Sequence, residues 1–420
     1  MKSNGYIAYA IAGVVPELRW TGNAIFSQRV FMSSSPSKPA AAAASWFEHP
    51  LTRLGEVLVL LYVFLVGVNG LSKGFQALGG GLLDSFFAAT DNPFMGLMVG
   101  ILATTLVQSS SVTTAMIVGF VAAPDNPLPI VNAVPMIMGA NIGTTVTNTI
   151  AALAHMGRKE EFRRAFAVAT CHDFFNYLAV FILLPLELLT GVLRKTATAM
   201  VSLVGGFGGA EYDSPIKGAI KAGSEPIKAV IDAVIPSSGF AAVVYIVVSG
   251  ILIFAALLLI VKVMRTAMVR HVEAMVSRVF GRNVILAMIV GVVVTVMVQS
   301  SSITTSLLVP LAGAGILTLR QAFPITLGAN VGTTVTALLA ALAATDENAA
   351  AGLTIALVHL LFNLSATVLI YPIKQIRNIP LAAARKMADI AVESRKWALV
   401  YILLMFYALP ALFAIVNRLL

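Results

Sequence analysis

Residues 107–114 read VQSSSVTT, and residues 298–305 repeat that run as VQSSSITT, 191 positions further along the chain. Each copy places one Gln and three Ser in the middle of a long apolar stretch. A second block follows each copy, because GANIGTTVT at 139–147 returns as GANVGTTVT at 328–336. Self-similar blocks in a fixed order mark a duplicated structural unit. The chain is therefore predicted to contain two homologous repeats.

A third block recurs in the same order and sets the extent of the repeats. It pairs His172 with His359, Phe175 with Phe362, Asn176 with Asn363, and Pro185 with Pro372. The spacing between copies shortens by two residues from one block to the next, as expected for short changes in connecting loops. We place the repeats at 94–190 and 284–377.

The composition indicates that lipid is the solvent of this chain. Hydrophobic residues make up 58% of the 420 residues and charged residues only 11%, against about 25% charged in soluble domains. No Lys or Arg occurs between Lys73 and Arg158, or between Arg320 and Lys374. We expect an all-α polytopic membrane protein.

The charge and the cysteine count exclude several other classes. The net charge of +9 comes from short basic clusters between apolar spans, which is typical of cytoplasmic loops rather than of a nucleic-acid groove. A single cysteine, Cys171, excludes an internal disulfide, a CxxC redox pair and a cysteine-based zinc site. Residues 1–50 lack the pattern of a cleaved signal peptide.

The placement of basic residues predicts the topology. Cytoplasmic loops are enriched in Lys and Arg, so the N-terminus and the clusters near 158–164, 262–282 and 374–396 are assigned to the cytoplasm. Each QSSS segment, 94–122 and 284–316, is expected to dip into the bilayer and return as a helical hairpin. The assignment gives the two repeats opposite orientations, which is inverted-repeat transporter architecture. Crossing spans are predicted at 54–76, 129–154, 165–190, 321–344, 350–372 and 397–417, with one more inside 241–283.

The segments outside the repeats are predicted to connect or flank them. Stretches 262–282 and 376–393 have apolar residues at helical spacing and basic residues on the other face, which favours helices along the cytoplasmic interface. The last span, 397–417, is expected only to pack at the periphery. The segments are an N-terminal cytoplasmic or surface segment (1–50), a leading transmembrane helix with an external connection (51–93), an external loop (191–240), a transmembrane helix with an interfacial helix (241–283), and an interfacial helix with the last transmembrane helix (378–420).

The QSSS runs are candidate anion sites. Polar groups in lipid are costly unless they find partners. Ser and Thr often serve only as contacts between transmembrane helices, but a four-residue polar run at matching places in two repeats favours a pair of broken helices whose tips meet near the bilayer midplane. Such tips expose N–H groups and a positive dipole end to an anion.

The GAN-x-GTT blocks are candidate cation sites on a neighbouring broken helix. Their two glycines permit close helix approach or local unwinding. Neutral side-chain oxygens suit a hard monovalent cation such as Na⁺. The oxygens come from Asn141, Thr144, Thr145, Asn330, Thr333 and Thr334.

The scarcity of charge predicts cotransport. No Lys or Arg in either hairpin or GAN helix can neutralise a bound anion, and an uncompensated buried dianion is too costly. Cations must therefore enter with it. Asp173 adds an intramembrane carboxylate whose counterpart is Leu360, so a dianion plus Asp173 calls for about three monovalent cations. Alternatively, His155, His172 or a proton neutralises Asp173, and His172 and His359 serve as structural hydrogen-bonding groups.

These residues carry a family resemblance. The two QSSS segments and the run GANIGTTVTNTIAAL…EFRRAFAVATCHDFFNYLAVFILLP, from Gly139 to Pro185, resemble the type II sodium-dependent inorganic phosphate cotransporters over roughly 54–375. The resemblance implies sodium-driven phosphate uptake by alternating access, no cofactor besides the co-transported sodium, and no enzymatic activity. Members that carry the Asp found here as Asp173 are electrogenic and bind an additional sodium ion.

The resemblance also implies ligands for both substrates. Phosphate would be held by Ser109, Ser110, Ser111, Ser300, Ser301 and Ser302. Sodium would be held by Gln108, Gln299, Asn141, Thr144, Thr145, Thr149, Asn330, Thr333, Thr334, Asp173, Asn176 and Asn363.

The chain departs from animal members of that family. Segment 191–240 lacks their cysteines and glycosylation sequons, which favours a bacterial cytoplasmic membrane, and His155–Arg158 differs from the expected polar Gln and Asp. Three alternatives remain open at this stage: a carrier for sulfate or a small carboxylate, a channel, and an intramembrane enzyme. No HExxH motif supports the enzyme, and nucleic acid is not an expected partner. The oligomeric state is not predicted.

Overall fold

The computed structural model describes residues 50–78, 92–123, 127–206, 215–235, 237–279, 283–343 and 348–419. Within those ranges every regular element is a helix and no strand occurs, which confirms the predicted all-α class. The N-terminal segment expected before residue 50 and the part of the external connection at 79–91 lie outside the described residues.

The helices follow one another with short connections. In chain order they are α2 (Pro50–Leu78), α4 (Pro93–Val107), α5 (Ser110–Val121), α6 (Ile130–Thr144), α7 (Val146–Ala152), the 3₁₀ turn η1 (Leu153–His155), α8 (Lys159–Thr190), α9 (Val192–Gly206), α10 (Pro215–Val234), α11 (Ser238–Val279), α12 (Val284–Val298), α13 (Ser301–Gly313), α14 (Leu319–Ala341), α15 (Ala349–Ile370), α16 (Lys374–Glu393), α17 (Arg395–Leu403), the π-helical turn η2 (Leu404–Ala408) and α18 (Leu409–Leu419).

Seven spans within the described residues are long and apolar enough to cross a membrane. They agree with the spans predicted from sequence. The bounds are Thr52–Leu71, Ile130–Leu153, Lys159–Thr190, Gly239–Ile260, Leu319–Ala341, Ala349–Ile370 and Arg395–Asn417.

The two QSSS segments form helical hairpins made of shorter helices. Helices α4 and α12 each contain 15 residues, which at 1.5 Å per residue is about 22 Å, less than the roughly 30 Å of a bilayer core. Local sequence fixes where both begin, because Asn92 and Asn283 cap them by accepting hydrogen bonds from Phe94 N and Ile285 N. Each of these two helices is therefore too short to cross the bilayer core by itself, which is consistent with a hairpin that enters and returns.

The predicted break in the GAN-x-GTT helix is found in only one half. In the first half a turn at Thr145 separates α6 from α7. In the second half α14 runs through Asn330 and Gly332 without interruption, so the prediction of a broken helix is wrong there. The glycines do not impose a break, because in both halves they serve close packing: a Cβ added at Gly328 would lie 1.9 Å from the carbonyl oxygen of Met288 on α12, and one added at Gly139 would lie 2.1 Å from that of Leu97 on α4.

Two connecting segments also differ from expectation. The stretch 191–240, predicted as a loop, contains α9 and α10. Gly191, with a φ of 64°, ends α8, and the Glu187 carboxylate accepts hydrogen bonds from Leu193 N and Arg194 N at the start of α9. The stretch 262–282 was expected to form a separate interfacial helix, but as far as Val279 it continues the preceding span in the 42-residue helix α11.

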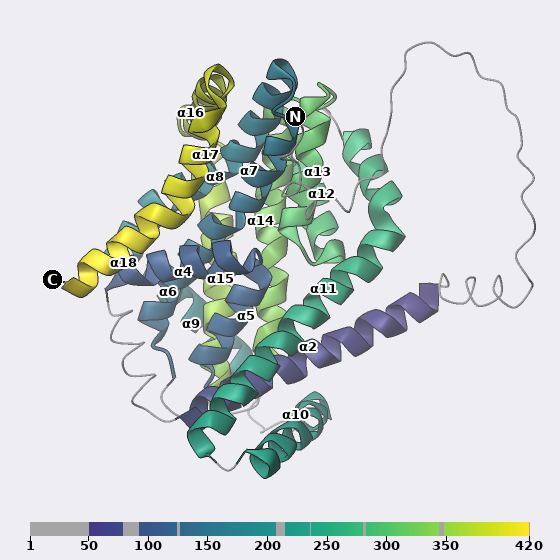
Figure 1. The fold of residues 1–420 in the computed structure, drawn as a ribbon, viewed down its shortest axis with the longest axis vertical. Helices are drawn as coiled ribbons and strands as arrows, with labels where there is room; N and C mark the ends of the chain where they lie inside the picture. The colour runs from purple at the N-terminus through teal and green to yellow at the C-terminus, as the bar shows by residue number, and fades with distance from the viewer. Residues whose placement is uncertain are drawn as a thin grey trace, which may run out of the picture. The chain divides into compact units, whose positions relative to one another are not determined.

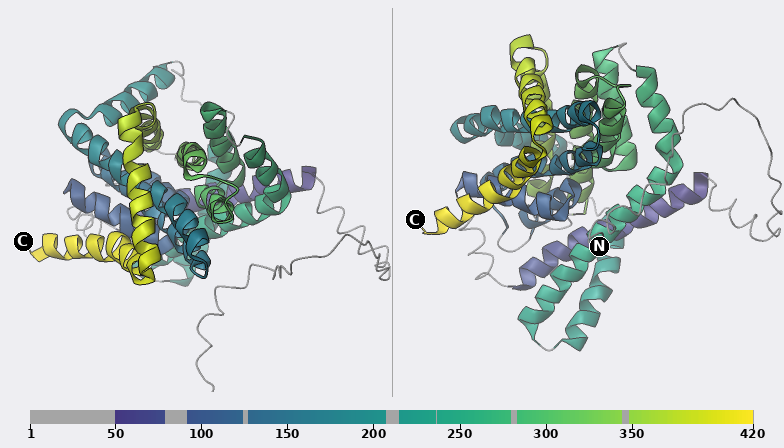
Figure 2. Two further views of the ribbon diagram at one scale, coloured as in Figure 1. Left: turned by 90° about the horizontal axis from the view of Figure 1, so that it is seen from above. Right: turned by 45° about the horizontal axis from the view of Figure 1, so that its top comes forward.

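Contacts between elements far apart in sequence organise the helices around the hairpins. Helix α4 packs on α6 and α12 packs on α14, while α5 contacts α14 and α15 from the other half, and α13 contacts α7 and α8. Helices α2 and α11 lie side by side as two long diagonal helices (Figures 1 and 2). Helix α16 lies at the end opposite α10 (Figure 1). Each hairpin is thus clamped between elements of both repeats.

Candidate functional site

The two hairpin tips have the same backbone geometry. Gln108 has φ and ψ of 58° and 25°, and Gln299 has 54° and 28°, which is the left-handed region that non-glycine residues seldom adopt. Among the described residues they are the two non-glycine positions with positive φ. This backbone turn ends one helix and lets the next begin two residues later. Such local strain gathers at functional sites.

The serine after each Gln caps the returning helix. Ser109 and Ser300 are extended, and their Oγ atoms accept hydrogen bonds from Val112 N and Ile303 N, each at 3.3 Å. Their carbonyls accept the next N–H groups, from Thr113 and Thr304. The first two N–H groups of a helix have no partner inside it, so each tip keeps two backbone donors, those of Ser110 and Ser111 in α5 and those of Ser301 and Ser302 in α13.

Both tips line one cavity of about 260 Å³. All six predicted phosphate-binding serines and both glutamines contribute to its wall, as do Thr147 and three apolar residues of α11, Phe254, Leu257 and Leu258. Among the residues that the structure describes, no Lys, Arg, His, Asp or Glu lines the cavity. Ser110 and Ser301 are 5% and 3% exposed. The fold therefore gathers the two runs that the sequence holds 191 residues apart.

A threonine from each GAN block orients each glutamine. The Thr147 hydroxyl donates to Gln108 Oε1 at 3.0 Å, and the Thr336 hydroxyl donates to Gln299 Oε1 at 3.1 Å. Each glutamine Nε2 in turn donates to a carbonyl of its own first helix, that of Thr105 at 2.5 Å and that of Val296 at 2.7 Å. The two halves thus repeat the contact as well as the sequence. Sequence reasoning missed both threonines, although they end the repeated blocks GANIGTTVT and GANVGTTVT.

The repeated blocks meet in a buried network of amides and imidazoles that joins the two halves. His172 Nε2 lies 2.6 Å from Asn330 Oδ1, and His359 Nε2 lies 3.4 Å from Asn141 Oδ1. Asn176 bridges the same two asparagines, because it accepts from Asn330 Nδ2 and donates to the Asn141 carbonyl, each at 2.8 Å. As expected, both histidines act as hydrogen-bonding groups. The three predicted sodium ligands in this network therefore also fix the halves against one another.

The network extends from His172 to the second hairpin through a residue that the sequence analysis did not select. Asn148 Nδ2 lies 3.3 Å from His172 Nδ1 and donates to Thr305 Oγ1 at 2.8 Å. The Asn148 side-chain oxygen also accepts a hydrogen bond from Ser306 at 2.9 Å. Hydrogen bonds therefore link the first turns of α13 directly to the first repeat.

Asp173 is fully buried and only partly paired. Its Oδ2 accepts hydrogen bonds from the Thr149 hydroxyl at 3.0 Å and from the Tyr401 hydroxyl at 2.9 Å. Its Oδ1 has no hydrogen-bond partner. Within the described residues, neither His155 nor His172 forms a hydrogen bond or an ion pair with Asp173; His172 lies within hydrogen-bond distance of Asn148 and Asn330, and His155 lies 4.0 Å from Glu161. A buried carboxylate with one unsatisfied oxygen is suited to a cation.

Tyr401 corrects the expectation for the last span. That span was expected only to pack at the periphery, but Tyr401 brings a hydroxyl from α17 to the carboxylate of α8. The π-helical turn that follows frees a carbonyl, and Met405 O accepts a hydrogen bond from the Tyr177 hydroxyl at 3.1 Å. A single tyrosine in an apolar span carries no pattern in the sequence, so no signal there could have found this contact.

The remaining predicted sodium ligands are threonines whose hydroxyls are bonded within their own helices. Thr144 and Thr333 donate to carbonyls four residues earlier, and Thr145 and Thr334 to carbonyls three residues earlier. A donating hydroxyl keeps its oxygen lone pairs for a cation. Asn363 donates to the His359 carbonyl, while its own buried side-chain oxygen has no partner.

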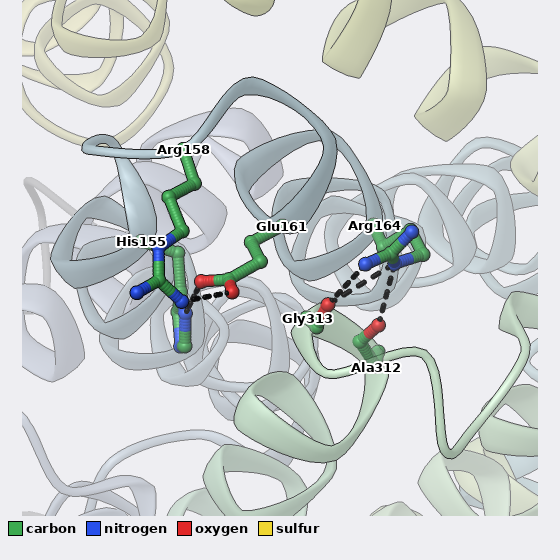
Figure 3. Close-up of polar contacts among 6 residues, drawn as sticks. All are labelled: His155, Arg158, Glu161, Arg164, Ala312 and Gly313. Carbon is green, nitrogen blue, oxygen red and sulfur yellow. Dashed lines mark hydrogen bonds and ion pairs between the residues drawn. The ribbon is translucent and has the colours of Figure 1, made fainter. Parts of the chain in front are cut away.

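The first turns of α8 anchor the far end of the second hairpin (Figure 3). Arg164 donates from Nε and Nη2 to the Gly313 carbonyl at 3.1 and 2.7 Å, and from Nε to the Ala312 carbonyl at 3.2 Å. These are the last carbonyls of α13, where a cation complements the helix dipole. Nearby, Arg158 forms a 2.6 Å ion pair with Glu161. The second hairpin is thus held at its end by the first repeat.

Comparison with known proteins identifies the family. The family model described as Na+/Pi-cotransporter matches residues 63–208 and 251–385, which include both hairpins and both GAN blocks. The sodium-dependent phosphate transport protein 2A of Rattus norvegicus is 34% identical over 433 residues, covering 86% of this chain and 67% of the relative. The protein 2B of Homo sapiens is 31% identical over 451 residues, covering 87% and 65%.

The match extends over most of this chain, which spans about two thirds of the length of these relatives. No solved structure matches the chain. The matched ranges contain every residue that lines the cavity between the two tips. The chain therefore belongs to the Na+/Pi-cotransporter family and is a membrane transporter rather than an enzyme.

Proposed function

We propose that this protein imports inorganic phosphate together with sodium ions, that phosphate binds in the cavity between the two QSSS tips, and that sodium binds at side-chain oxygens of the two repeats. The observation that carries the proposal is the cavity itself, which is lined by six serines and two glutamines and by no charged side chain. Two helix N-termini with free N–H groups supply donors for an anion. Relatives named sodium-dependent phosphate transport proteins support this choice of substrates.

Electrostatics makes sodium part of the binding site. No cationic side chain lines the cavity, and helix dipoles alone do not offset the burial of a dianion. Sodium held by Gln, Thr and Asn oxygens, and by the free oxygen of Asp173, lowers the net charge that enters the apolar layer. About three monovalent cations balance one dianion and one carboxylate. With three sodium ions, one phosphate dianion and the Asp173 carboxylate bound together, the occupied protein would carry no net charge at these groups while it changes between its two access states.

Alternating access follows from the paired architecture. The two hairpins have matching tips, and contacts such as His172–Asn330 and His359–Asn141 join opposite halves. We propose that the halves are inverted repeats that rock about this shared network and expose the cavity to one side at a time. We also propose a bacterial inner membrane, with the N-terminus, the Arg158–Arg164 connection and α16 on the cytoplasmic side, because basic loops stay in the cytoplasm.

The decisive experiment is radiolabelled phosphate uptake into proteoliposomes that contain the purified protein. We expect saturable uptake with an inward sodium gradient, no uptake when choline replaces sodium, and faster uptake at an inside-negative voltage. Unlabelled sulfate in tenfold excess should compete little. Uptake of equal rate in choline medium would overturn the proposal, and strong competition by sulfate would reassign the anion.

A further inference from the structure

A second cavity lies away from the hairpin tips and is strongly basic. It has a volume of about 450 Å³ and lies between the start of α8, the turn from α13 to α14, and α16. In the described part of the chain, four arginines line it, Arg163, Arg164, Arg320 and Arg385, together with one acidic residue, Glu160. The four guanidinium groups come from three elements that are far apart in sequence. Only the fold brings them together.

Two of these arginines are already compensated. Arg163 pairs with Asp389 of α16, from Nε to Oδ1 at 3.0 Å, and with Glu160 at 3.6 Å. Arg164 donates hydrogen bonds from Nε and Nη2 to the carbonyls of Ala312 and Gly313 (Figure 3). These contacts hold the walls of the cavity, because they tie α8 to α16 and to the end of α13.

The other two arginines have no partner. In the part of the chain that the structure describes, neither Arg320 nor Arg385 forms a hydrogen bond or an ion pair with a carboxylate. Thr318 and Leu319, at the start of the 23-residue helix α14, line the same cavity. The positive end of that helix dipole adds to the two free charges. The net surplus is about two positive charges, and it faces a space large enough for a polyatomic ion.

We propose that this cavity binds a phosphate group. A phosphate dianion matches the surplus of two charges, and arginine forks fit its oxygens in bidentate fashion. The group comes from one of two sources, the free phosphate ion or the headgroup of an anionic phospholipid. The site is separate from the tips: α13 has 13 residues, so its two ends lie about 20 Å apart, with the QSSS tip at one end and the arginine cavity at the other.

The arginine cavity differs from the tip cavity in one measurable way. Arginines neutralise the anion, so binding here does not require sodium, whereas the proposed tip site does. Equilibrium binding of radiolabelled phosphate is therefore measured in choline buffer, with the full-length protein in nanodiscs of phosphatidylcholine. The test variant is Arg320→Gln with Arg385→Gln. Its matched control is Lys374→Gln with Lys396→Gln, which removes two exposed charges outside the cavity.

A second arm tests the lipid source. Wild type, test variant and control are purified from membranes that contain phosphatidylglycerol, and the lipid retained by each is measured by native mass spectrometry. If the affinity for phosphate in choline buffer becomes about tenfold weaker in the test variant and not in the control, the site is assigned to free phosphate. Loss of retained phosphatidylglycerol in the test variant alone assigns it to the lipid headgroup.

The proposal is overturned if the test variant and the lysine control behave alike in both arms. Added salt provides an internal check, because binding to exposed arginines must weaken as the Debye length shortens to about 3 Å at 1 M. Sodium-dependent uptake is scored separately in the same preparations. A wild type that binds phosphate in choline but shows no sodium-driven uptake would refute the proposed function and leave the arginine cavity standing.

Discussion

The hydroxyl of Tyr401 on α17 donates a 2.9 Å hydrogen bond to Oδ2 of Asp173 on α8, although 228 residues separate them. The bond fixes one carboxylate oxygen and leaves Oδ1, buried and without a partner, as the free ligand. Together with Thr149, Tyr401 thus orients the one acidic side chain that the proposed cation site contains. The last span thus brings a hydrogen bond to the proposed cation site from outside both repeats.

Replacing Tyr401 by Phe tests that role. The variant keeps the ring contacts with Phe166, Phe174 and Phe406 and loses only the donor, about 1 kcal/mol of net hydrogen bonding. We expect the sodium concentration for half-maximal phosphate uptake to rise about fivefold, with the maximal rate at saturating sodium unchanged. Tyr407→Phe is the matched control, since no hydrogen bond involves the Tyr407 hydroxyl within the described residues. Equal sodium activation curves for the two variants would refute the assignment.

Asp173 is expected to set the charge carried per phosphate. Asp173→Asn preserves volume and an acceptor oxygen for Tyr401 but removes the negative charge, so one sodium ion fewer is needed. We predict that the current per transported phosphate, recorded on solid-supported membranes, falls sharply while uptake persists. Asp389→Asn, which removes an exposed carboxylate of α16, should leave the ratio unchanged. An undiminished ratio in Asp173→Asn would contradict this role.

The tip serines are expected to bind phosphate directly. Ser110→Ala and Ser301→Ala each remove a buried hydroxyl, and the loss of one hydrogen bond to an anion weakens apparent phosphate affinity by on the order of 1–3 kcal/mol. Concentration dependence of uptake measures the effect. Ser202→Ala, on the exposed face of α9, serves as control. A double variant Ser110→Ala, Ser301→Ala with normal affinity would remove these hydroxyls from the site.

The glycines of the GAN helices are predicted to be essential for hairpin packing. A Cβ at Gly139 would lie 2.1 Å from the Leu97 carbonyl of α4, and backbone cannot yield as a flexible side chain can. Gly139→Ala should lower the thermal midpoint in detergent by several degrees and reduce uptake. Gly250→Ala provides the control, because nothing lies within 4 Å of its added Cβ and alanine favours the helix. A Gly139→Ala protein as stable as Gly250→Ala would show that α4 and α6 can separate.

The sequence alone determined the repeated units and their chemistry. Hydropathy reveals the crossing spans because each span needs about 20 apolar residues to cross the lipid and must form its backbone hydrogen bonds within its own helix. The duplication of QSSS identifies both hairpins, and the two runs adopt the same left-handed turn at Gln108 and Gln299. Neutral oxygens with no Lys or Arg beside them indicate cation-coupled anion binding in any fold, because a buried anion needs a positive charge nearby.

Only the tertiary structure decided which residues meet. The 260 Å³ cavity exists because α5 and α13 start at one place, and no periodicity encodes that distance. The contact of Tyr401 with Asp173 and the cluster of Arg320 with Arg385 likewise join elements that carry no shared pattern. Even the continuity of α14 depends on context, because the GAN-x-GTT block is interrupted at its second Thr, Thr145, in one half and unbroken in the other. Local sequence sets how each helix turns, while packing between helices sets what its side chains touch.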